Sequence, residues 1–531
     1  MPAIQFLDIR RGRGNPMIGP HSSWVGRQSR CGSRTDFVGE YKAFRFETII
    51  RPMYDEHQAQ IHYRDQRRAH WDHVVSSNIT GRSLGGYYHS RLETVYSNVI
   101  SPNLRVLEIG SGSGALLASL QPAYGVGVDI ASQMLMQARK DHPGLHFIQA
   151  DGHALPFSTT FDVIILSDLL NDVWDVQQLL GEITKVSHWD TRIIINVYSR
   201  IWQIPLHLVR AVRLATPLLP QNWLTPGDLQ SLLALENIET VRTWGEVLLP
   251  LHLPLLTSIV NRFLARIWPL NLFALCHFIV ARKHPRPANI RDHKKVSVII
   301  PARNEAGNIP QILARVPEMG SGTELIFVEG HSKDETYQVI QAEMAKHPEL
   351  QCQLHRQDGV GKGDAVRKGF DLATGDFLMI LDADLTVPPE MLPRFYKVLQ
   401  SRTGEFVNGV RLVYPMEDRA MRFLNLIGNK FFSLAFSWLL GQPIKDTLCG
   451  TKALSRKSYD RIASNRAYFG DFDPFGDFDL LFGAARQNHK FVEIPIRYRE
   501  RTYGDTNIDR WRHGTLLLQM MLYGARRLKF I

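Results

Sequence analysis

The amino-acid sequence predicts an α/β protein made of two domains, each with parallel strands joined by helices. Short apolar runs bounded by turn signals recur along the chain, and such runs are typical of fully buried parallel strands. Helical patterns lie between most of these runs, which favours parallel strands with crossover helices. A basic, proline-containing segment without periodicity, residues 284–295, separates two series of this kind and is interpreted as a linker.

The composition is that of a globular protein with an anionic partner. Of 531 residues, 44% are hydrophobic and 21% charged, which suits an ample core, and the length suffices for two to four domains of roughly 100–200 residues each. The net charge of +10 indicates nucleic acid, a phosphate-bearing substrate or an acidic membrane surface as partner. The four cysteines lack metal-like spacing, so neither a zinc site nor a disulfide framework is expected, and a reducing compartment fits.

No targeting or membrane-spanning segment is expected. Residues 1–45 are rich in Arg, Gly and Ser, lack the apolar core of a secretory signal, and are interpreted as a flexible basic extension. The longest uncharged stretches, around 247–260, 268–281 and 431–444, fall short of the roughly 18 apolar residues that a spanning helix needs. They are interpreted as buried core or as interfacial helices. We therefore expect a cytoplasmic protein, or one bound peripherally to the cytoplasmic membrane face.

The first domain, residues 46–283, has a glycine loop after its first strand. Strands are predicted at 105–109, 125–129, 147–151, 161–167 and 193–197, with Gly110, Gly112 and Gly114 directly after the first. Glycines at this point let the backbone approach a ligand at a helix N-terminus. Asp129 ends the second strand, where it could bind a ribose. These features alone fit either a nicotinamide dinucleotide or S-adenosylmethionine.

Two further acids favour S-adenosylmethionine. Glu108 lies inside the first strand and faces the loop, where it could meet the cationic amino group of the ligand. Asp151 ends the third strand and could bind an adenine amine.

The motifs of this domain resemble the class I S-adenosylmethionine-dependent methyltransferases over about residues 85–280. The motifs that carry the resemblance lie at residues 106–114, 127–129, 150–157 and 161–168. The resemblance implies a Rossmann-like domain in which Glu108 and the three glycines hold the methionine part, Asp129 the ribose, and Asp151 with Gly152 the adenine. It leaves the methyl acceptor open. An Asp or Asn in the segment 167–172 either orients that acceptor or caps the next helix. No Asn-Pro-Pro-Tyr-like motif is present, so a nucleic-acid substrate is not expected.

In the second domain, residues 296–531, two carboxylates follow a buried strand. Strands are predicted at 296–300, 324–328 and 377–381, and Asp382 and Asp384 come directly after the third. On an extended chain both side chains point the same way, at the sheet edge where open α/β sheets bind ligands. They can hold a divalent cation that neutralises a diphosphate. The alternative is that they end the strand in a solvated turn.

The order of motifs in this domain resembles family 2 glycosyltransferases with the GT-A fold, over about residues 296–510. The motifs are those around 301–305, Glu329, 359–367 and 382–384. The resemblance implies that four residues line the nucleotide pocket, namely Pro301, Arg303, Glu305 and Glu329. It also places Asp382 at the sugar-nucleotide diphosphate and Asp384 as the ligand of Mg²⁺ or Mn²⁺. Lys362 lies in a glycine-flanked loop suited to phosphate, and the alternative is a solvated lysine in a turn.

The acceptor end resembles the polyprenyl-phosphate sugar synthases, on the stretches 446–452, 475–481 and 492–506. A phosphate monoester is largely dianionic at pH 7 and already nucleophilic, so it needs charge neutralisation more than a general base. Arg499 and Arg501 could clamp it if they share one face of a strand, or they could form the solvent face of an edge strand. Asp479 is the expected base if the acceptor is instead a hydroxyl. The apolar segments 423–440 and 511–530 fit either a bilayer interface or packing on the core or a partner subunit.

The sequence therefore predicts a bifunctional enzyme. Its glycosyltransferase would move a sugar from a UDP- or GDP-sugar to a polyprenyl phosphate or similar lipid, and its methyltransferase would act on an unidentified acceptor. The alternative is a glycosyltransferase that acts on a hydroxyl of a glycan or lipid, with the first domain a non-catalytic S-adenosylmethionine-binding module. RNA modification, motivated by net charge alone, is a third hypothesis.

Overall fold

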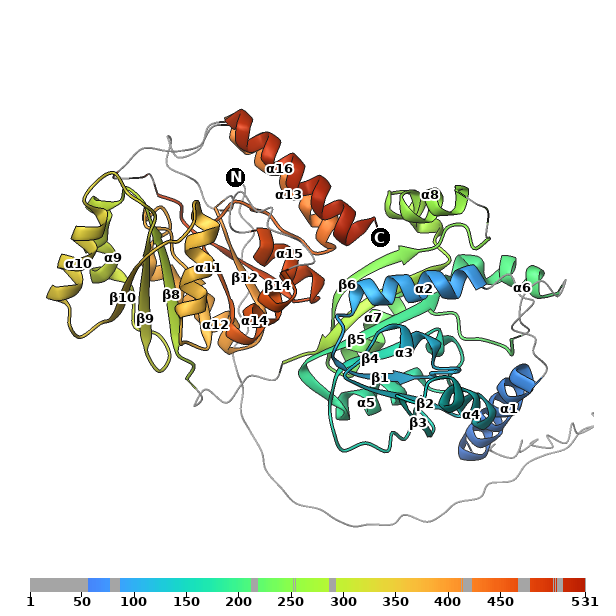
Figure 1. Ribbon diagram of the computed structural model, residues 1–531. Coiled ribbons are helices and arrows are strands. Elements are labelled where there is room, and N and C mark those ends of the chain that lie inside the picture. Colours follow the sequence, from blue (N-terminus) through green and yellow to red (C-terminus); the bar gives the residue numbers. More distant parts are fainter. Residues whose placement is uncertain are drawn as a thin grey trace, which may run out of the picture. The chain divides into compact units, whose positions relative to one another are not determined.

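The computed structural model describes residues 56–76, 86–211, 218–251, 253, 255–285, 293–411, 413, 423–466, 478–499, 501, 503 and 510–530. The predicted extension 1–45 and most of the predicted linker lie outside these residues. Residues 55–531 form one compact unit, and within it the chain builds two mixed sheets of seven strands each (Figure 1).

The first sheet has the strand order β3-β2-β1-β4-β5-β7-β6. Neighbours from β3 to β5 pair in parallel, and β7 pairs antiparallel with both β5 and β6. The bounds are β1 (Arg105–Ile109), β2 (Tyr124–Asp129), β3 (His146–Gln149), β4 (Phe161–Ser167), β5 (Ser187–Tyr198), β6 (Ile238–Glu246) and β7 (Cys276–Lys283). The five strands expected from apolar runs are present, although β3 ends two residues early and β5 begins earlier.

Helices cover both faces of this sheet. One face packs against buried side chains of α2, α3 and α4, and the other against those of α5 and α7. The helices are α1 (Glu56–Ser76), α2 (Gly86–Val99), α3 (Ala115–Ser119), α4 (Ser132–Asp141), α5 (Val176–Lys185), α6 (Gln203–Ala211), α7 (Pro226–Leu235) and α8 (Leu256–Arg262). This is a doubly wound arrangement, in which the carboxyl edge of the parallel strands is free to form a site.

The second sheet has the order β10-β9-β8-β11-β13-β12-β14, in which β13 pairs antiparallel with both neighbours and all other pairs are parallel. The bounds are β8 (Val296–Ala302), β9 (Thr323–Glu329), β10 (Gln351–Arg356), β11 (Phe377–Ile380), β12 (Phe406–Val410), β13 (Lys452–Ser455) and β14 (Phe491–Pro495). The three predicted strands are β8, β9 and β11. They lie next to each other, so their carboxyl ends meet at one edge.

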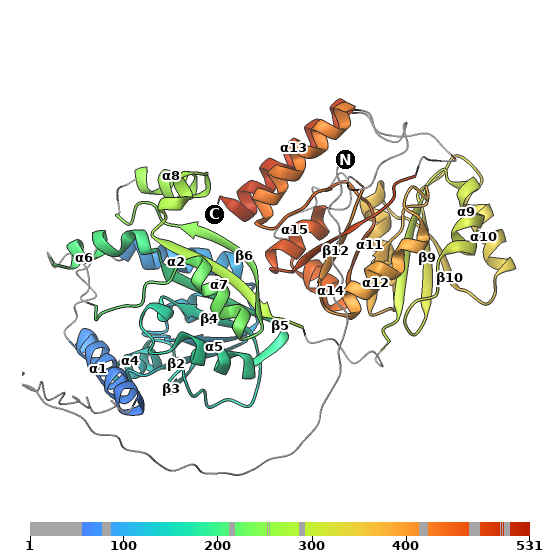
Figure 2. The ribbon, with the colours of Figure 1, turned by 180° about the vertical axis from the view of Figure 1, so that it is seen from behind.

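The helices of this half also form two layers. Buried side chains of α11, α13, α14, α15 and α16 pack on one face of the sheet, and those of α9, α10 and α12 on the other (Figure 2). The bounds are α9 (Ile309–Arg315), α10 (Thr336–Lys346), α11 (Lys362–Leu372), α12 (Leu392–Gln400), α13 (Phe423–Leu440), α14 (Arg456–Ser464), α15 (Phe478–Arg486) and α16 (Arg510–Gly524).

The two helices expected at a bilayer interface or against the core, α13 and α16, have two-sided character. Phe436 and Met520 are buried in the core, whereas Leu434 and Leu522 are exposed. Packing on the core is therefore real, and an apolar outer face remains. Within the described residues, no helix combines the length and the apolar character needed to cross a bilayer.

A buried ion-pair network joins the two sheets. Glu405, directly before β12, accepts hydrogen bonds at 2.7 Å on both carboxylate oxygens from Arg192 of β5, and lies 3.1 Å from Arg282 of β7. Burial alone would raise the pKa of Glu405, but the two guanidinium groups outweigh it and hold the pKa at about 2. The carboxylate is therefore ionised and fully paired inside the protein.

Candidate functional sites

The glycine loop between β1 and α3 has the backbone that its sequence predicts. Gly110, Gly112 and Gly114 have φ angles of 75°, 51° and 74°, in the left-handed region that only glycine adopts without strain. A Cβ on Gly114 would also lie 2.5 Å from the ring of Phe147. The loop therefore needs these glycines, and it leaves its backbone open at the edge of the sheet.

Two of the predicted cofactor acids are held by hydrogen bonds at this edge. The Asp129 carboxylate accepts from the backbone amides of Gly112 (2.9 Å) and Ala131 (2.8 Å), and burial raises its pKa against their effect. Asp151 accepts from the amide and the ring of His153. Burial opposes ionisation of Asp151, but the contacts with His153, supported by Arg64, lower its pKa. Both carboxylates are fixed in orientation before any ligand binds.

Glu108 is a buried acid of the site with one unsatisfied oxygen. It is 3% exposed, and its Oε2 atom has no hydrogen-bond partner among the residues that the structure describes. Burial raises the pKa of Glu108 to about 8, with a smaller contribution from Asp129. An unpaired buried carboxylate is costly, and a ligand ammonium group would satisfy it. The residues therefore fit S-adenosylmethionine, which carries such a group.

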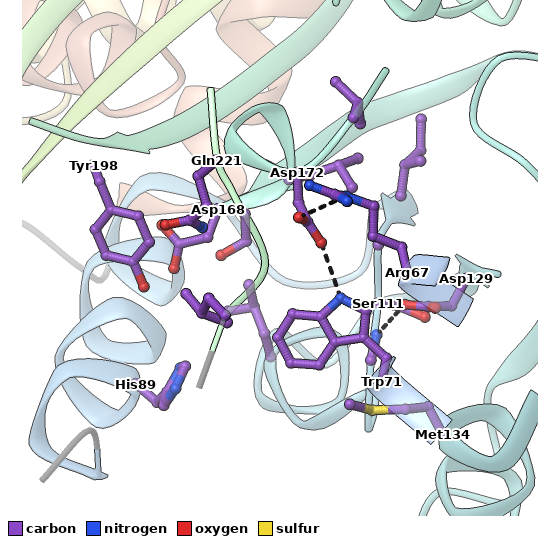
Figure 3. Close-up of a pocket in the computed structure, with 18 of the residues that line it drawn as sticks. Arg67, Trp71, His89, Ser111, Asp129, Met134, Asp168, Asp172, Tyr198 and Gln221 are labelled. Atoms are coloured by element: carbon purple, nitrogen blue, oxygen red, sulfur yellow. Dashed lines mark hydrogen bonds and ion pairs between the residues drawn. The ribbon is translucent and has the colours of Figure 1, made fainter. Parts of the chain in front are cut away.

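These residues line a cavity of about 1110 Å³. Helix α1, which the sequence analysis missed, supplies part of its wall through Arg67 and Trp71. Both donate hydrogen bonds to Asp172, from Arg67 Nε at 3.0 Å and Trp71 Nε1 at 2.9 Å (Figure 3). The cavity exceeds the usual range of ~300–1,000 Å³ for small-molecule sites, so it has room for a cofactor and a second substrate.

Asp168 lies at the end of the cavity away from Asp129, beside Tyr198 (Figure 3). Its Oδ1 atom accepts hydrogen bonds from Tyr88 (2.9 Å) and Asn196 (2.5 Å), and burial raises its pKa to about 7. As the first flanking residue of the following 3₁₀ turn, Asp168 makes no side-chain capping bond. Asp168 therefore does not cap this turn through its side chain, and its role toward a methyl acceptor stays a prediction.

The second site lies at the carboxyl ends of β8, β9 and β11. Lys362, at the first position of α11, contacts Asp382 at 2.6 Å, and Arg501 contacts Asp384 at 2.7 Å and Glu305 at 3.7 Å. Five residues that are distant in sequence but were predicted to share a site are thus brought together. Gly450 closes the group, because a Cβ there would overlap both the Asp382 carboxylate and the Lys362 ammonium.

The charges in this second site are closely balanced. Burial opposes ionisation of Asp382, but Lys362 and more distant cations lower its pKa. Burial raises the pKa of Glu305 to about 7, against the attraction of Arg501. Cations and anions therefore alternate across the site, an arrangement that can receive a diphosphate together with a cation.

The remaining nucleotide-pocket residues lie around this charge cluster. Pro301 lies within β8, and the Arg303 side chain is exposed just after it. Glu329 ends β9, is buried, and accepts a hydrogen bond from the backbone amide of Ser332.

A metal at Asp384 would use few protein ligands. Among the described residues, no three His, Cys, Asp or Glu side chains are grouped to hold a metal ion. Mg²⁺ commonly takes only one or two carboxylates and completes its shell with phosphate oxygens and water. Asp384, whose carboxylate is partly accessible beside Thr386 and Arg501, fits that mode.

The residues expected at the acceptor do not lie together on a strand. β14 ends at Pro495, so Arg499 and Arg501 follow the strand and do not share one of its faces. Arg501 turns toward Asp384, whereas the Arg499 side chain is exposed and its amide donates to the backbone oxygen of Thr386. Asp479, in the first turn of α15, lies 3.8 Å from Arg367 and 3.6 Å from Arg466. It lines a separate small pocket with residues such as Ile462.

Comparison with known proteins identifies both halves. Residues 107–195 match the family model "Methyltransferase domain", and residues 297–463 match "Glycosyl transferase family 2". The chain is 27% identical over 220 residues to a dolichol-phosphate mannosyltransferase of Pyrococcus furiosus, covering 40% of this chain and 59% of that one. It is 29% identical over 234 residues to an undecaprenyl-phosphate 4-deoxy-4-formamido-L-arabinose transferase of Pseudomonas syringae, covering 43% and 65%.

The chain thus spans less than two thirds of the length of these relatives. Among solved structures, a glucosyl-3-phosphoglycerate synthase from Mycobacterium tuberculosis aligns with 18% identity and a TM-score of 0.34, covering 45% of this chain and 80% of that one. The expectation of two transferase domains in this order is confirmed by the family models.

Proposed function

We propose that this chain, in which a methyltransferase domain precedes a family 2 glycosyltransferase domain, moves a sugar from a UDP- or GDP-sugar to a polyprenyl phosphate or similar lipid phosphate. The domains would comprise residues 46–283 and 296–531, joined by the linker 284–295. The observation that carries the proposal is the charge cluster in which Lys362 meets Asp382, and Arg501 meets Asp384. The names of the two relatives, which specify dolichol phosphate and undecaprenyl phosphate, support the acceptor class.

The reaction would be a single in-line displacement. An oxygen of the acceptor phosphate forms the new bond to the anomeric carbon, while the bond from that carbon to the nucleoside diphosphate breaks and the diphosphate takes the electron pair. Configuration inverts. A dianionic phosphate needs no general base, so the protein supplies positioning and charge.

Each charged residue then has a defined task. Lys362 neutralises the diphosphate, together with the positive end of the backbone at the start of α11. Arg501, next to Asp384, neutralises the acceptor phosphate. A Mg²⁺ or Mn²⁺ ion held by Asp384 would act as a Lewis acid on the leaving group. Pro301, Arg303, Glu305 and Glu329 would line the nucleotide pocket, and exposed Arg499 would meet the lipid phosphate.

The first domain would bind S-adenosylmethionine in the cavity. Glu108 would pair with the amino group, Asp129 with the ribose hydroxyls, and Asp151 with Gly152 at the adenine. Bound there, the cofactor supplies an electrophilic methyl group. Asp168, held by Tyr88 and Asn196, lies at the other end of the cavity, where it would orient the acceptor and take its proton.

Transfer of label from UDP- and GDP-sugars into an organic-extractable product tests the glycosyltransferase. The assay contains polyprenyl phosphate and Mg²⁺. It compares the wild type with Asp384→Asn and with the control Glu349→Gln, which changes an exposed carboxylate outside the charge cluster. Label with the wild type and the control, and not with Asp384→Asn, is the expected result. If no donor gives label, a hydroxyl acceptor with Asp479 as base becomes the better proposal. The labelled nucleotide-sugars would then be tested with a glycan or a lipid that carries a hydroxyl.

A further inference from the structure

The methyltransferase half exposes a concentrated apolar surface on residues 251–273. Scattered apolar side chains are normal on protein surfaces, but a contiguous exposed patch marks an interaction site. Leu255 and Trp268 are 80% and 75% exposed. The exposed large apolar residues of this stretch are Leu251, Leu253, Leu255, Leu256, Ile259, Phe263, Ile267, Trp268, Leu270, Leu272 and Phe273. They include much of two stretches that the sequence left open between core and interface.

Helix α6 extends the same surface. Ile204 and Leu208, four residues apart on one helix face, are 73% and 61% exposed, while Leu206 packs toward the core. The Trp202 indole, just before α6, donates a hydrogen bond to the backbone oxygen of Phe273 at 2.9 Å. This bond joins the chain just before α6 to the end of the stretch 251–273.

The charges on and beside this surface are positive. Residues 247–275 contain no Asp or Glu, and Arg262 is exposed among the apolar side chains. Arg262 donates to the backbone oxygen of Phe530 at 3.0 Å, and the rings of Phe263 and Phe530 lie 5.1 Å apart. The exposed Arg526 and Arg527 precede Phe530 by a few residues. Apolar side chains flanked by arginines complement a bilayer with anionic headgroups.

The cavity of the methyltransferase half shares lining residues with this surface. Its lining includes Leu251, which is itself exposed, and Leu206 of α6. Leu251 and Leu206 give the cavity an apolar wall next to the patch, and Asp168 lines the same cavity. A molecule that crosses this wall needs an apolar body, and its reacting group must be polar enough to meet Asp168.

We propose that residues 251–273 together with α6 form a docking surface for an anionic lipid bilayer, and that an amphiphilic methyl acceptor enters the cavity from that bilayer. The inference deepens the proposed function, because both halves of the chain would then take substrates from one membrane. The methyl step balances: the acceptor's oxygen or nitrogen forms the bond to the methyl carbon, the sulfonium sulfur keeps the electron pair, and the acceptor's proton passes to the Asp168 carboxylate.

Binding of the full chain to vesicles tests the docking surface. We would compare phosphatidylcholine vesicles with vesicles that also contain about 30% phosphatidylglycerol, because this fraction of anionic lipid gives a clear negative surface potential. The test variant combines Ile204→Asn, Leu255→Asn and Ile259→Asn, three exposed positions outside the cavity lining. The matched control is Leu235→Asn, which is 63% exposed on α7.

The expected result is preferential binding to the anionic vesicles, reduced at least about tenfold in the triple variant and unchanged in the control. Hydrogen exchange of the full chain should show protection of peptides within 251–273 when vesicles are added. Unchanged binding by the triple variant, or vesicle binding without that protection, would overturn the proposal. So would a dimer of the wild type that the triple variant abolishes, because a second copy would then cover the surface.

Sugar transfer and methyl transfer are measured separately, so that failure of the docking surface can be told from failure of the proposed function. Sugar transfer to detergent-solubilised polyprenyl phosphate does not need the docking surface, so the triple variant should retain it. The acceptor class is tested with radiolabelled S-adenosylmethionine and a total membrane lipid extract. Label in the organic phase supports an amphiphilic acceptor, and label found only in water-soluble material contradicts it.

Discussion

Glu108 should make cofactor binding dependent on pH, and replacing it by Gln should remove that dependence. The residue is 3% exposed, one of its carboxyl oxygens has no hydrogen-bond partner in the described part of the chain, and its pKa is raised to about 8. It is therefore mostly protonated at pH 6 in the empty site. A ligand ammonium group needs the ionised form, so binding at low pH must release a proton.

The sign and the size follow from linkage. The free protein binds more protons than the complex, so affinity rises with pH until Glu108 is ionised without help. Between pH 8 and pH 6 the ionised fraction of a group with a pKa of 8 falls about 50-fold, which corresponds to about 2.3 kcal/mol of binding free energy. An α-amino group has a pKa near 7.7–8.0. Measurements between about pH 5.5 and 7 keep the ligand charge constant, and the dissociation constant should fall nearly tenfold per pH unit.

Isothermal titration calorimetry with S-adenosylhomocysteine measures this slope, since that molecule keeps the amino group but carries no transferable methyl. Buffers of different ionisation enthalpy should report release of about one proton near pH 6.5. Glu108→Gln should bind weakly with no slope, and Glu236→Gln, a partly exposed acid of the same half, should behave as the wild type. A flat profile for the wild type, or an unchanged slope in Glu108→Gln, would refute the reasoning.

Four further substitutions test other parts of the structure. Glu405→Gln should cost about 3–5 kcal/mol of unfolding free energy, because it leaves the buried Arg192 without its carboxylate partner. In the wild type the folded pKa of Glu405, about 2, lies below the unfolded value. This stabilisation is therefore full above about pH 5 and fades toward pH 2, as denaturant titrations at several pH values would show. Gly450→Ala should abolish sugar transfer with little loss of melting temperature, because the added Cβ displaces Asp382 and Lys362; full activity would place these groups outside the reaction. Arg501→Ala should lower kcat/KM for a lipid phosphate by about 10²-fold or more, because charge-assisted hydrogen bonds are lost. Asp479→Asn should leave the rate within a few-fold. A large loss in Asp479→Asn with a small one in Arg501→Ala would indicate a hydroxyl acceptor.

Sequence patterns predicted strands that are mostly apolar along their length and bounded by turns. β1, β4, β8 and β11 are of this kind, and all are buried along most of their length. The sequence analysis missed β6 and β7 in the first half, and β10, β12 and β13 in the second. β6 carries charged residues and is only partly buried, and the apolar run of β7 continues the apolar surface stretch before it. Local periodicity cannot separate a buried strand from an adjoining apolar surface.

The candidate sites show the same division. Glu108 was predicted from its position inside the first strand facing the glycine loop, and Asp129 from its position at a strand end. The sheet order brings them to one cavity. Helix α1 was missed because its sequence is polar along most of its length, although its Arg67 and Trp71 line that cavity. The position of Arg501 beside Asp384 depends on a chain path after β14 that no local signal encodes.

A direct comparison of two acceptors tests the central claim, that the glycosyltransferase acts on a lipid phosphate. The same labelled nucleotide-sugar is offered to the wild type with polyprenyl phosphate and with the matched polyprenol, which differs only in lacking the phosphate. The account predicts labelled lipid from polyprenyl phosphate alone, because the cations around Asp382 and Asp384 receive a charged acceptor. Equal or faster transfer to the polyprenol would contradict it.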